Sequence, residues 1–361
     1  QKFRIVSDVV KDMRKTDPTR PVCFDSNYLH NKASKRFGDD FLKTVDDGDI
    51  DDNHAYYNWY DYSVFRFFNG EFQKQFKSPG RPLISQEMST GYPNAETGHP
   101  TRSYQLIHQN PYSLIGYEAY DWGNPASFLN TQSFITGELA ETLRRTNEQA
   151  SGIMHFAYMT WFRQCYDHRN IQPYPTYYAM QRAMQPVLVS AELWGRNLYA
   201  GEKLHTRIYV VNDNEEGRDL KPMSLAWSIV DETNKVLASG TEQFPAVEYY
   251  GRKYIEPNIH MPSNLPADKV NVKLKLTLTE SGVTLSQNEY GLLLARKEWN
   301  IGQITADKKV LLLDKDHMKA TLDFLNIACQ TVPSIKELLN AKQKANLCII
   351  SGLKECTDEE A

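Results

Sequence analysis

The sequence lacks several features that would point to common classes of function. It has no apolar run of about 18 residues, the length needed for a transmembrane helix. Acidic residues (45) slightly outnumber lysine and arginine (41), so the charge of −4 gives no sign of a nucleic-acid or polybasic membrane-binding surface. The five cysteines are scattered, with neither metal-site nor disulfide spacing. No glycine-rich phosphate loop is present. The sequence therefore predicts no metal, no cofactor, no nucleic-acid partner and no membrane span.

Aromatic residues are abundant, at 12% of the chain with 21 Tyr and 6 Trp. Such residues suit stacking on sugar rings, although they also suit a large hydrophobic core. The first residue is Gln1, and a helical pattern is already under way in Lys2–Arg14. No signal peptide is visible, which says nothing of localisation. We expect the chain to begin inside a larger protein.

Residues 1–185 alternate between apolar strands and helices, which predicts a parallel α/β domain. About four β/α units are present, too few to close an eight-stranded barrel. The loop between residues 93 and 130 is long enough to suggest a function. The strands are expected at Val22–Asn27, before Tyr60, at Leu83–Glu87 and at Gly152–Trp161, with helices at Lys2–Arg14, Phe65–Phe76 and Phe134–Asn147.

Two further domains follow. Residues 186–300 carry short apolar or alternating strands separated by turn residues, the pattern of an immunoglobulin-like β-sandwich. A carbohydrate-binding module is the alternative, but no clustered surface aromatics favour it. Residues 301–361 read as strand, helix, helix and strand, the opening of a doubly wound, flavodoxin-like α/β segment that is only partial.

The stretch Arg81–Tyr92 holds the first candidate for chemistry. A short apolar run, Pro82 to Ile84, gives way within three residues to the carboxylate of Glu87, and a small, glycine-containing loop follows. In a barrel of parallel strands, a carboxylate at the carboxyl end of a strand lies on the face where catalytic groups collect. The alternative is a strand end whose glutamate caps the next helix or pairs with a surface arginine.

Several motifs in order resemble the second half of the catalytic barrel of glycoside hydrolase family 2, the β-galactosidase, β-glucuronidase and β-mannosidase group. Roughly residues 1–296 are covered. The motifs are Thr16–Val22 (entry to the fifth strand), Asp49–Tyr60 with its Tyr-Tyr-Asn-Trp-Tyr (sixth), Arg81–Glu87 (seventh), Met159–Trp161 (eighth) and Pro175–Val189 (exit helix).

The resemblance implies a retaining exo-β-glycosidase, most similar to β-galactosidases, that acts on a polysaccharide or oligosaccharide. Retaining hydrolysis uses two carboxylates about 5–5.5 Å apart. Glu87 would be the nucleophile, and Tyr56 would donate a hydrogen bond to it. The substrate-binding candidates are His54, Trp59, Trp161, Asn53 and, more weakly, Glu118. Structural roles for Tyr56 and His54 remain open alternatives, as do loop-anchoring roles for Glu118 and Asp121.

The sequence also departs from the family. The general acid/base should be a glutamate in an Asn-Glu pair ahead of the opening helix, so we expect it upstream, in the missing amino-terminal half of the barrel. Met88 stands where the family usually has tyrosine, and the Asn-x-Lys element of β-glucuronidases is absent after Trp161. An inactive fragment that binds carbohydrate or a partner is therefore the second hypothesis. The resemblance alone implies a secreted or periplasmic protein, and a homo-oligomer is left open.

Overall fold

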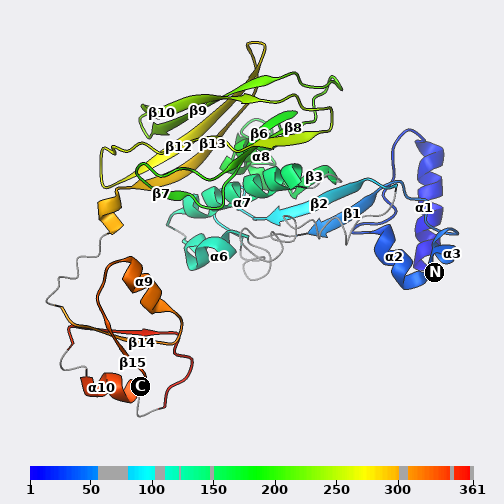
Figure 1. Cartoon of the computed structure of the whole chain (residues 1–361). Coiled ribbons are helices and arrows are strands. Elements are labelled where there is room, and N and C mark those ends of the chain that lie inside the picture. The colour runs from blue at the N-terminus through cyan, green and yellow to red at the C-terminus, as the bar shows by residue number, and fades with distance from the viewer. Residues whose placement is uncertain are drawn as a thin grey trace.

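The structure is a computed structural model that describes residues 1–55, 80–101, 110–121, 123–146, 150–300, 308–341 and 345–357. It is a mixed α/β structure with many strands (Figure 1). The predicted helix at Phe65–Phe76 lies outside the described residues. In the part of the chain that is described, no helix is long and apolar enough to cross a membrane.

The amino-terminal part contains one parallel sheet. Its three strands, β1 (Asp51–Ala55), β2 (Leu83–Thr90) and β3 (Ala150–Phe156), lie side by side in chain order. Three helices precede β1, namely α1 (Lys2–Thr16), α2 (His30–Phe37) and α3 (Asp39–Leu42).

The strand predicted at Val22–Asn27 is reduced to one parallel bridge between Cys23 and Ile50. Side chains take the backbone donors that a strand would use. The carboxylate of Asp49 accepts a hydrogen bond from the N–H of Val22, and that of Asp52 accepts one from Asn27. Because these donors are already bonded, the ladder does not extend.

One long helix covers the sheet. This helix, α7 (Pro125–Thr146), packs on β2 and β3, with α8 (Pro175–Ala183) beside it (Figure 1). It begins at Pro125 rather than at Phe134, since proline suits the first helical turn and the Asn124 side chain accepts a hydrogen bond from the N–H of Ala126. The preceding loop contains α6 (Asn110–Ile115) and the 3-10 helix η2 (Gly116–Tyr120).

The strand predicted to reach Trp161 is shorter. β3 ends at Phe156, and residues 158–161 form the 3-10 helix η3 (Tyr158–Trp161). The Thr160 hydroxyl donates to the carbonyl of Ala157 at 2.8 Å, so a local turn replaces the extended backbone. A small hairpin of β4 (Phe162–Arg163) and β5 (Gln172–Pro173) then leads to α8.

Two sheets that share one hydrophobic cluster follow. Their strand orders are β10-β9-β12-β13-β7 and β11-β8-β6, antiparallel except for the β13–β7 pair. We call this unit the sandwich. Its strands are β6 (Val187–Glu192), β7 (Asn197–Tyr199), β8 (Arg207–Asn212), β9 (Met223–Asp231), β10 (Val236–Phe244), β11 (Arg252–Ile255), β12 (Lys269–Glu280) and β13 (Val283–Ala295).

A buried polar network joins α7 to the sandwich. The Glu141 carboxylate accepts hydrogen bonds from Ser190 on β6 (2.5 Å) and from Asn288 (2.9 Å) and Tyr290 (2.6 Å) on β13. The guanidinium of Arg145 donates to the Ser190 hydroxyl and lies 3.5 Å from the Glu141 carboxylate. Burial and Glu141 raise the pKa of Tyr290 well above its usual range. The network fixes the sandwich on the helix that covers β2.

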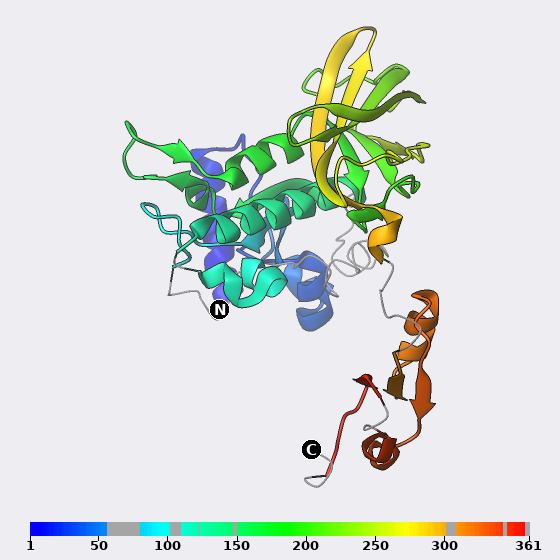
Figure 2. The ribbon, with the colours of Figure 1, turned by 90° about the vertical axis from the view of Figure 1, so that its left-hand side faces the viewer.

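The carboxy-terminal part lies apart from the rest (Figures 1 and 2). After the 3-10 helix η4 (Lys297–Asn300) and an undescribed stretch, it forms a parallel sheet of order β15-β14-β16. The short strand β15 was not predicted. The elements are β14 (Val310–Asp314), α9 (Met318–Phe324), β15 (Gln330–Val332), α10 (Ile335–Ala341) and β16 (Leu347–Ser351).

Candidate active site

A backbone irregularity places Glu87 next to His54. Along β1 and β2, Asn53 pairs with Ser85, but the next residue, His54, pairs with Glu87. Gln86 is therefore an extra residue in β2, a β-bulge of the kind that re-aims side chains near active sites. In a regular ladder Gln86 would lie beside His54. The bulge brings Glu87 beside His54 instead. Glu87 was predicted at the end of its strand, but β2 continues for three more residues, to Thr90.

The bulge also decides which face of the sheet Glu87 occupies. Leu83 and Met88 belong to one hydrophobic cluster with Ile135 and Leu139 of α7, so both face the helix. Residues five apart in a regular strand would face opposite sides, and the extra residue restores the match. Glu87 precedes Met88 and points away from the helix. On β3, Met154 alternates with the helix-facing Ile153 and is 50% exposed. The described residues therefore do not cover the side of the sheet on which Glu87 lies.

The imidazole of His54 links two carboxylates. Its Nδ1 lies 3.2 Å from Glu87 Oε2, and its Nε2 lies 3.0 Å from Asp52 Oδ2. The Glu87 side chain keeps 19% of its surface exposed, whereas Asp52 keeps only 2%. The hydroxyl of Ser26 also lies 3.3 Å from Nε2. Asp52 therefore orients the histidine from within, and Glu87 is the carboxylate that a ligand can reach.

A loop before α2 holds this arrangement from the side. The Asn27 amide oxygen accepts the backbone N–H of His54 at 3.0 Å, and the Asn27 N–H donates to Asp52 at 2.9 Å. Asn27 adopts a positive φ of 53°, which asparagine tolerates better than most residues. The β1 backbone and its carboxylate are thus fixed by one residue that neither composition nor spacing identified.

A second polar cluster lies under the amino ends of the strands. The fully buried Asp46 carboxylate contacts the His30 imidazole at 2.6 Å, the Tyr28 hydroxyl at 2.8 Å and the Arg81 guanidinium at 3.1 Å. Burial alone would raise the pKa of Asp46, but the hydrogen bonds from His30, Gly48 and Tyr28, with the charge of Arg81, hold this pKa below its ordinary value. Arg81, the first residue of the motif, thus anchors the start of β2.

The remaining predicted site residues have different positions. Tyr56 and Trp59 lie outside the described residues. Asn53 is buried and alternates with His54 along β1, so it faces away from the Glu87 side. Glu118 lies exposed on η2, where it accepts a hydrogen bond from Ser127 of α7 at 3.3 Å. Of the predicted residues, the described structure brings only His54 and Glu87 into contact.

Trp161 lies on the helix side of the sheet. Its indole packs against the cluster that contains Met88, and its Nε1–H donates to Nδ1 of the buried His155 at 2.8 Å. His155 alternates with Phe156 along β3, so Phe156 faces the Glu87 side. Phe156 pairs with Thr90 and makes an edge contact with Tyr92, with ring centroids 6.0 Å apart. The strand-end aromatic on the Glu87 face is therefore Phe156, which was missed because the strand was expected to continue to Trp161.

We expect His155 to make the stability of the chain depend on pH. Burial lowers the pKa of His155 to about 3, whereas an unfolded histidine titrates near 6.5. Below pH 6.5 the unfolded chain binds this proton and the folded chain does not. The free energy of unfolding should therefore fall by up to about 1.4 kcal/mol per pH unit until the pH nears the folded pKa.

The measurement is the melting temperature between pH 7 and pH 4. His155→Gln keeps an acceptor for the Trp161 indole and does not titrate, so its melting temperature should fall less steeply with acid. His168→Gln, at an exposed position, is the matched control. Equal slopes for the wild type and His155→Gln would contradict the assignment.

No cluster of histidine, cysteine, aspartate and glutamate suited to a metal ion occurs among the described residues, and the described cysteines are unpaired. The site is instead a carboxylate–imidazole–carboxylate chain on a sheet face that the described helices leave open. Such a chain can keep a histidine oriented beside a reachable carboxylate, as nucleophilic or acid–base chemistry needs.

Comparison with solved structures gives remote matches. An exo-chitosanase (CsxA) from Amycolatopsis orientalis aligns with 74% of this chain and 35% of its own, at 14% identity and a TM-score of 0.41. A β-D-mannosidase from Dictyoglomus thermophilum aligns with 72% of this chain and 34% of its own, at 14% identity and a TM-score of 0.43. A β-glucuronidase from glycoside hydrolase family 2 aligns with 30% of this chain and 11% of its own, at 16% identity and a TM-score of 0.23.

The similar solved structures thus include members of glycoside hydrolase family 2, the family whose motifs the sequence resembles. No protein-family model matches the chain, and no curated protein sequence matches it. The chain spans about a third of the length of the exo-chitosanase and mannosidase chains.

Proposed function

We propose that this chain is part of a retaining exo-β-glycosidase of the glycoside hydrolase family 2 type, β-galactosidase-like, with Glu87 as its nucleophile. The observation that carries the proposal is the position of the Glu87 carboxylate. It is partly exposed on the face of a parallel sheet that the described helices leave open, and it lies 3.2 Å from an imidazole that a buried aspartate orients. In this proposal β1, β2 and β3 belong to the second half of a (β/α)8 barrel.

The chemistry requires a second carboxylate. In retaining hydrolysis one carboxylate attacks the anomeric carbon, and another protonates the leaving oxygen before it activates water. Asp52 is a poor candidate for the second role, because it is almost fully buried and engaged by Asn27 and His54. We therefore place the acid/base glutamate in a segment that precedes Gln1 in the natural polypeptide, where it would complete the open face.

The other residues have supporting roles in this proposal. Tyr56 follows β1 by one residue and would donate a hydrogen bond to Glu87, while Trp59 would line the rim of the sugar site. His54 would hold Glu87 in place and contact a sugar hydroxyl, and Phe156 would offer the apolar surface earlier expected of Trp161. The same proposal includes three further points. The sandwich would be immunoglobulin-like, residues 301–361 would be part of a doubly wound domain, and the protein would be secreted or periplasmic.

The test is covalent trapping in the natural polypeptide that contains this chain. A panel of aryl β-glycosides first identifies the sugar that is hydrolysed. The corresponding 2-deoxy-2-fluoro glycoside, which slows release of the glycosyl-enzyme, should then label one carboxylate. Peptide mass spectrometry should find the added glycosyl mass on Glu87 at one equivalent per chain.

Label on another carboxylate, with hydrolysis intact, would remove Glu87 from the nucleophile position. Binding of an oligosaccharide without hydrolysis of any glycoside would instead favour the second hypothesis, an inactive fragment that binds carbohydrate. The face that bears Glu87 is open enough to allow it, since Met154 on the same face is half exposed.

A further inference from the structure

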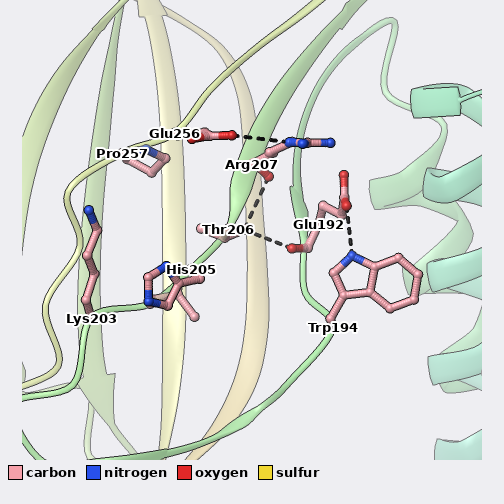
Figure 3. A pocket seen from close by; sticks show the side chains of 9 residues that line it. Glu192, Trp194, Lys203, His205, Thr206, Arg207, Glu256 and Pro257 are labelled. Carbon is pink, nitrogen blue, oxygen red and sulfur yellow. Dashed lines mark hydrogen bonds and ion pairs between the residues drawn. The ribbon is translucent and has the colours of Figure 1, made fainter. Parts of the chain in front are cut away.

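A pocket of about 470 Å³ opens on the sandwich (Figure 3). It lies where β6 ends, β8 begins and the chain leaves β11. Its walls carry one large aromatic ring, three basic side chains and two carboxylates. The residues that form these walls are Trp194, Lys203, His205, Arg207, Glu192 and Glu256.

The sequence gives the basic side chains a common direction. Lys203, His205 and Arg207 are exposed, whereas Leu204 and Thr206 between them are buried. Alternation along an extended backbone therefore sends the basic side chains to one side and the small or apolar ones into the core. The Thr206 hydroxyl donates to the carbonyl of Glu192 at 3.0 Å and ties this segment to the end of β6.

Trp194 forms the opposite wall. Figure 3 shows its indole across the pocket from Lys203 and His205. The indole Nε1 donates to Glu192 Oε1 at 2.8 Å, which holds the ring in one orientation, and 39% of the residue is exposed. A large apolar ring surface that is held in one orientation, open to solvent and beside polar groups suits the apolar face of a pyranose ring.

The charges around the pocket balance. Arg207 lies 3.4 Å from Glu256 and over the ring of Tyr254, with 5.0 Å to the ring centroid. Glu192 accepts the Trp194 indole N–H. The lining thus carries two carboxylates, of Glu192 and Glu256, and two cationic side chains, of Lys203 and Arg207. His205 adds a polar group that can donate or accept a hydrogen bond. A lining of this kind offers both donors and acceptors without favouring a ligand of either charge.

We propose that this pocket binds a neutral pyranose unit of a glycan, with Trp194 stacked on the sugar ring and Lys203, His205 and the carboxylates bonded to its hydroxyl groups. The choice of ligand class rests on the proposed glycosidase function. The site itself is separate, since none of its residues belongs to the sheet that carries Glu87. It would hold a polymeric substrate near the chain without taking part in the chemistry.

The test measures binding to the whole chain, Gln1–Ala361, carrying Glu87→Gln so that no ligand is turned over. The neutral probes are cellohexaose, xylohexaose and mannohexaose. Oligogalacturonate and chitosan hexaose serve as the anionic and cationic comparison ligands. Isothermal titration should detect one of the neutral glycans. In the chain that also carries Trp194→Ala, the Kd for that glycan should rise by about tenfold, as loss of one aromatic contact predicts. Tyr249→Ala, which removes an exposed aromatic side chain at the other end of β11, should leave the Kd unchanged.

Three results would contradict the proposed sugar site: no binding of any neutral glycan, equal affinity after Trp194→Ala, or tighter binding of a charged glycan than of any neutral one. Hydrolysis of small aryl glycosides is scored separately, in the natural polypeptide with Glu87 intact, where Trp194→Ala should leave kcat/KM unchanged. If hydrolysis fails while Trp194→Ala still weakens glycan binding, the pocket proposal stands and the glycosidase proposal falls. If hydrolysis succeeds while Trp194→Ala leaves glycan binding intact, the glycosidase proposal stands and the pocket proposal falls.

Discussion

Glu87→Gln is expected to lower kcat/KM on the best aryl β-glycoside by roughly 10⁴- to 10⁶-fold, the range seen when an enzyme loses its nucleophile. Glutamine has nearly the same size as glutamate, so the bulge at Gln86 and the packing of Met88 should persist. Its amide lacks the charge needed to attack the anomeric carbon and form the glycosyl-enzyme. The His54 imidazole, 3.2 Å from the Glu87 carboxylate, would also lose one of its two carboxylate partners and keep Asp52.

The measurement is steady-state hydrolysis by the natural polypeptide, with the melting temperature recorded alongside. Glu216→Gln provides the control, because Glu216 is an exposed glutamate on the sandwich, paired with Arg218. It should retain wild-type kcat and KM. Full activity in Glu87→Gln, with an unchanged melting temperature, would refute the assignment of the nucleophile.

Arg145→Met should destabilise the chain by about 3–5 kcal/mol, the usual effect of removing one partner from a buried ion pair. Arg145 is almost fully buried and bonds the hydroxyls of Ser190 and Thr142. Without it, the Glu141 carboxylate would remain charged between α7 and the sandwich, with only neutral donors around it. The junction between the helix over β2 and the sandwich should therefore loosen first.

Urea unfolding followed by tryptophan fluorescence would show the effect as a lower midpoint. The matched control is Arg20→Met, which breaks an exposed pair with Asp17 and should change stability by less than about 1 kcal/mol. Arg145→Met combined with Glu141→Gln should recover part of the loss, because the buried charge is removed with its partner. Equal midpoints for Arg145→Met and Arg20→Met would show that the buried pair contributes nothing.

The sequence anticipated strand β2 and the change to antiparallel strands after Pro186, because both carry local apolar patterns. The residues of β1 are mostly polar, and a strand was expected there through the resemblance of Asp49–Tyr60 to the family's sixth strand. It also placed His54 and Glu87 among the site residues. It could not give their contact, which depends on the bulge at Gln86, since no alternation pattern reveals an extra residue in a strand.

The errors have physical causes. Trp161 was expected on a strand because the apolar run continues to it, but the Thr160 hydroxyl closes a local turn that ends β3 earlier. The start of α7 was missed because its first turns carry polar residues, and the signal there is the Asn124 cap followed by Pro125. The pocket beside Trp194 joins three strands distant in sequence, so no search for clustered aromatics along the chain could have found it.

The face that Glu87 occupies depends on the bulge in β2 as well as on the order of its residues. If β2 kept all its residues and paired with β1 in a regular ladder, Gln86 would lie beside His54 and every residue after it would change faces. The Glu87 carboxylate would then turn into the apolar layer beneath α7, and the Met88 thioether would turn toward the open face. An alignment of β2 with a regular strand must therefore place one insertion at Gln86, because without it Glu87 is matched to a residue on the opposite face of the sheet.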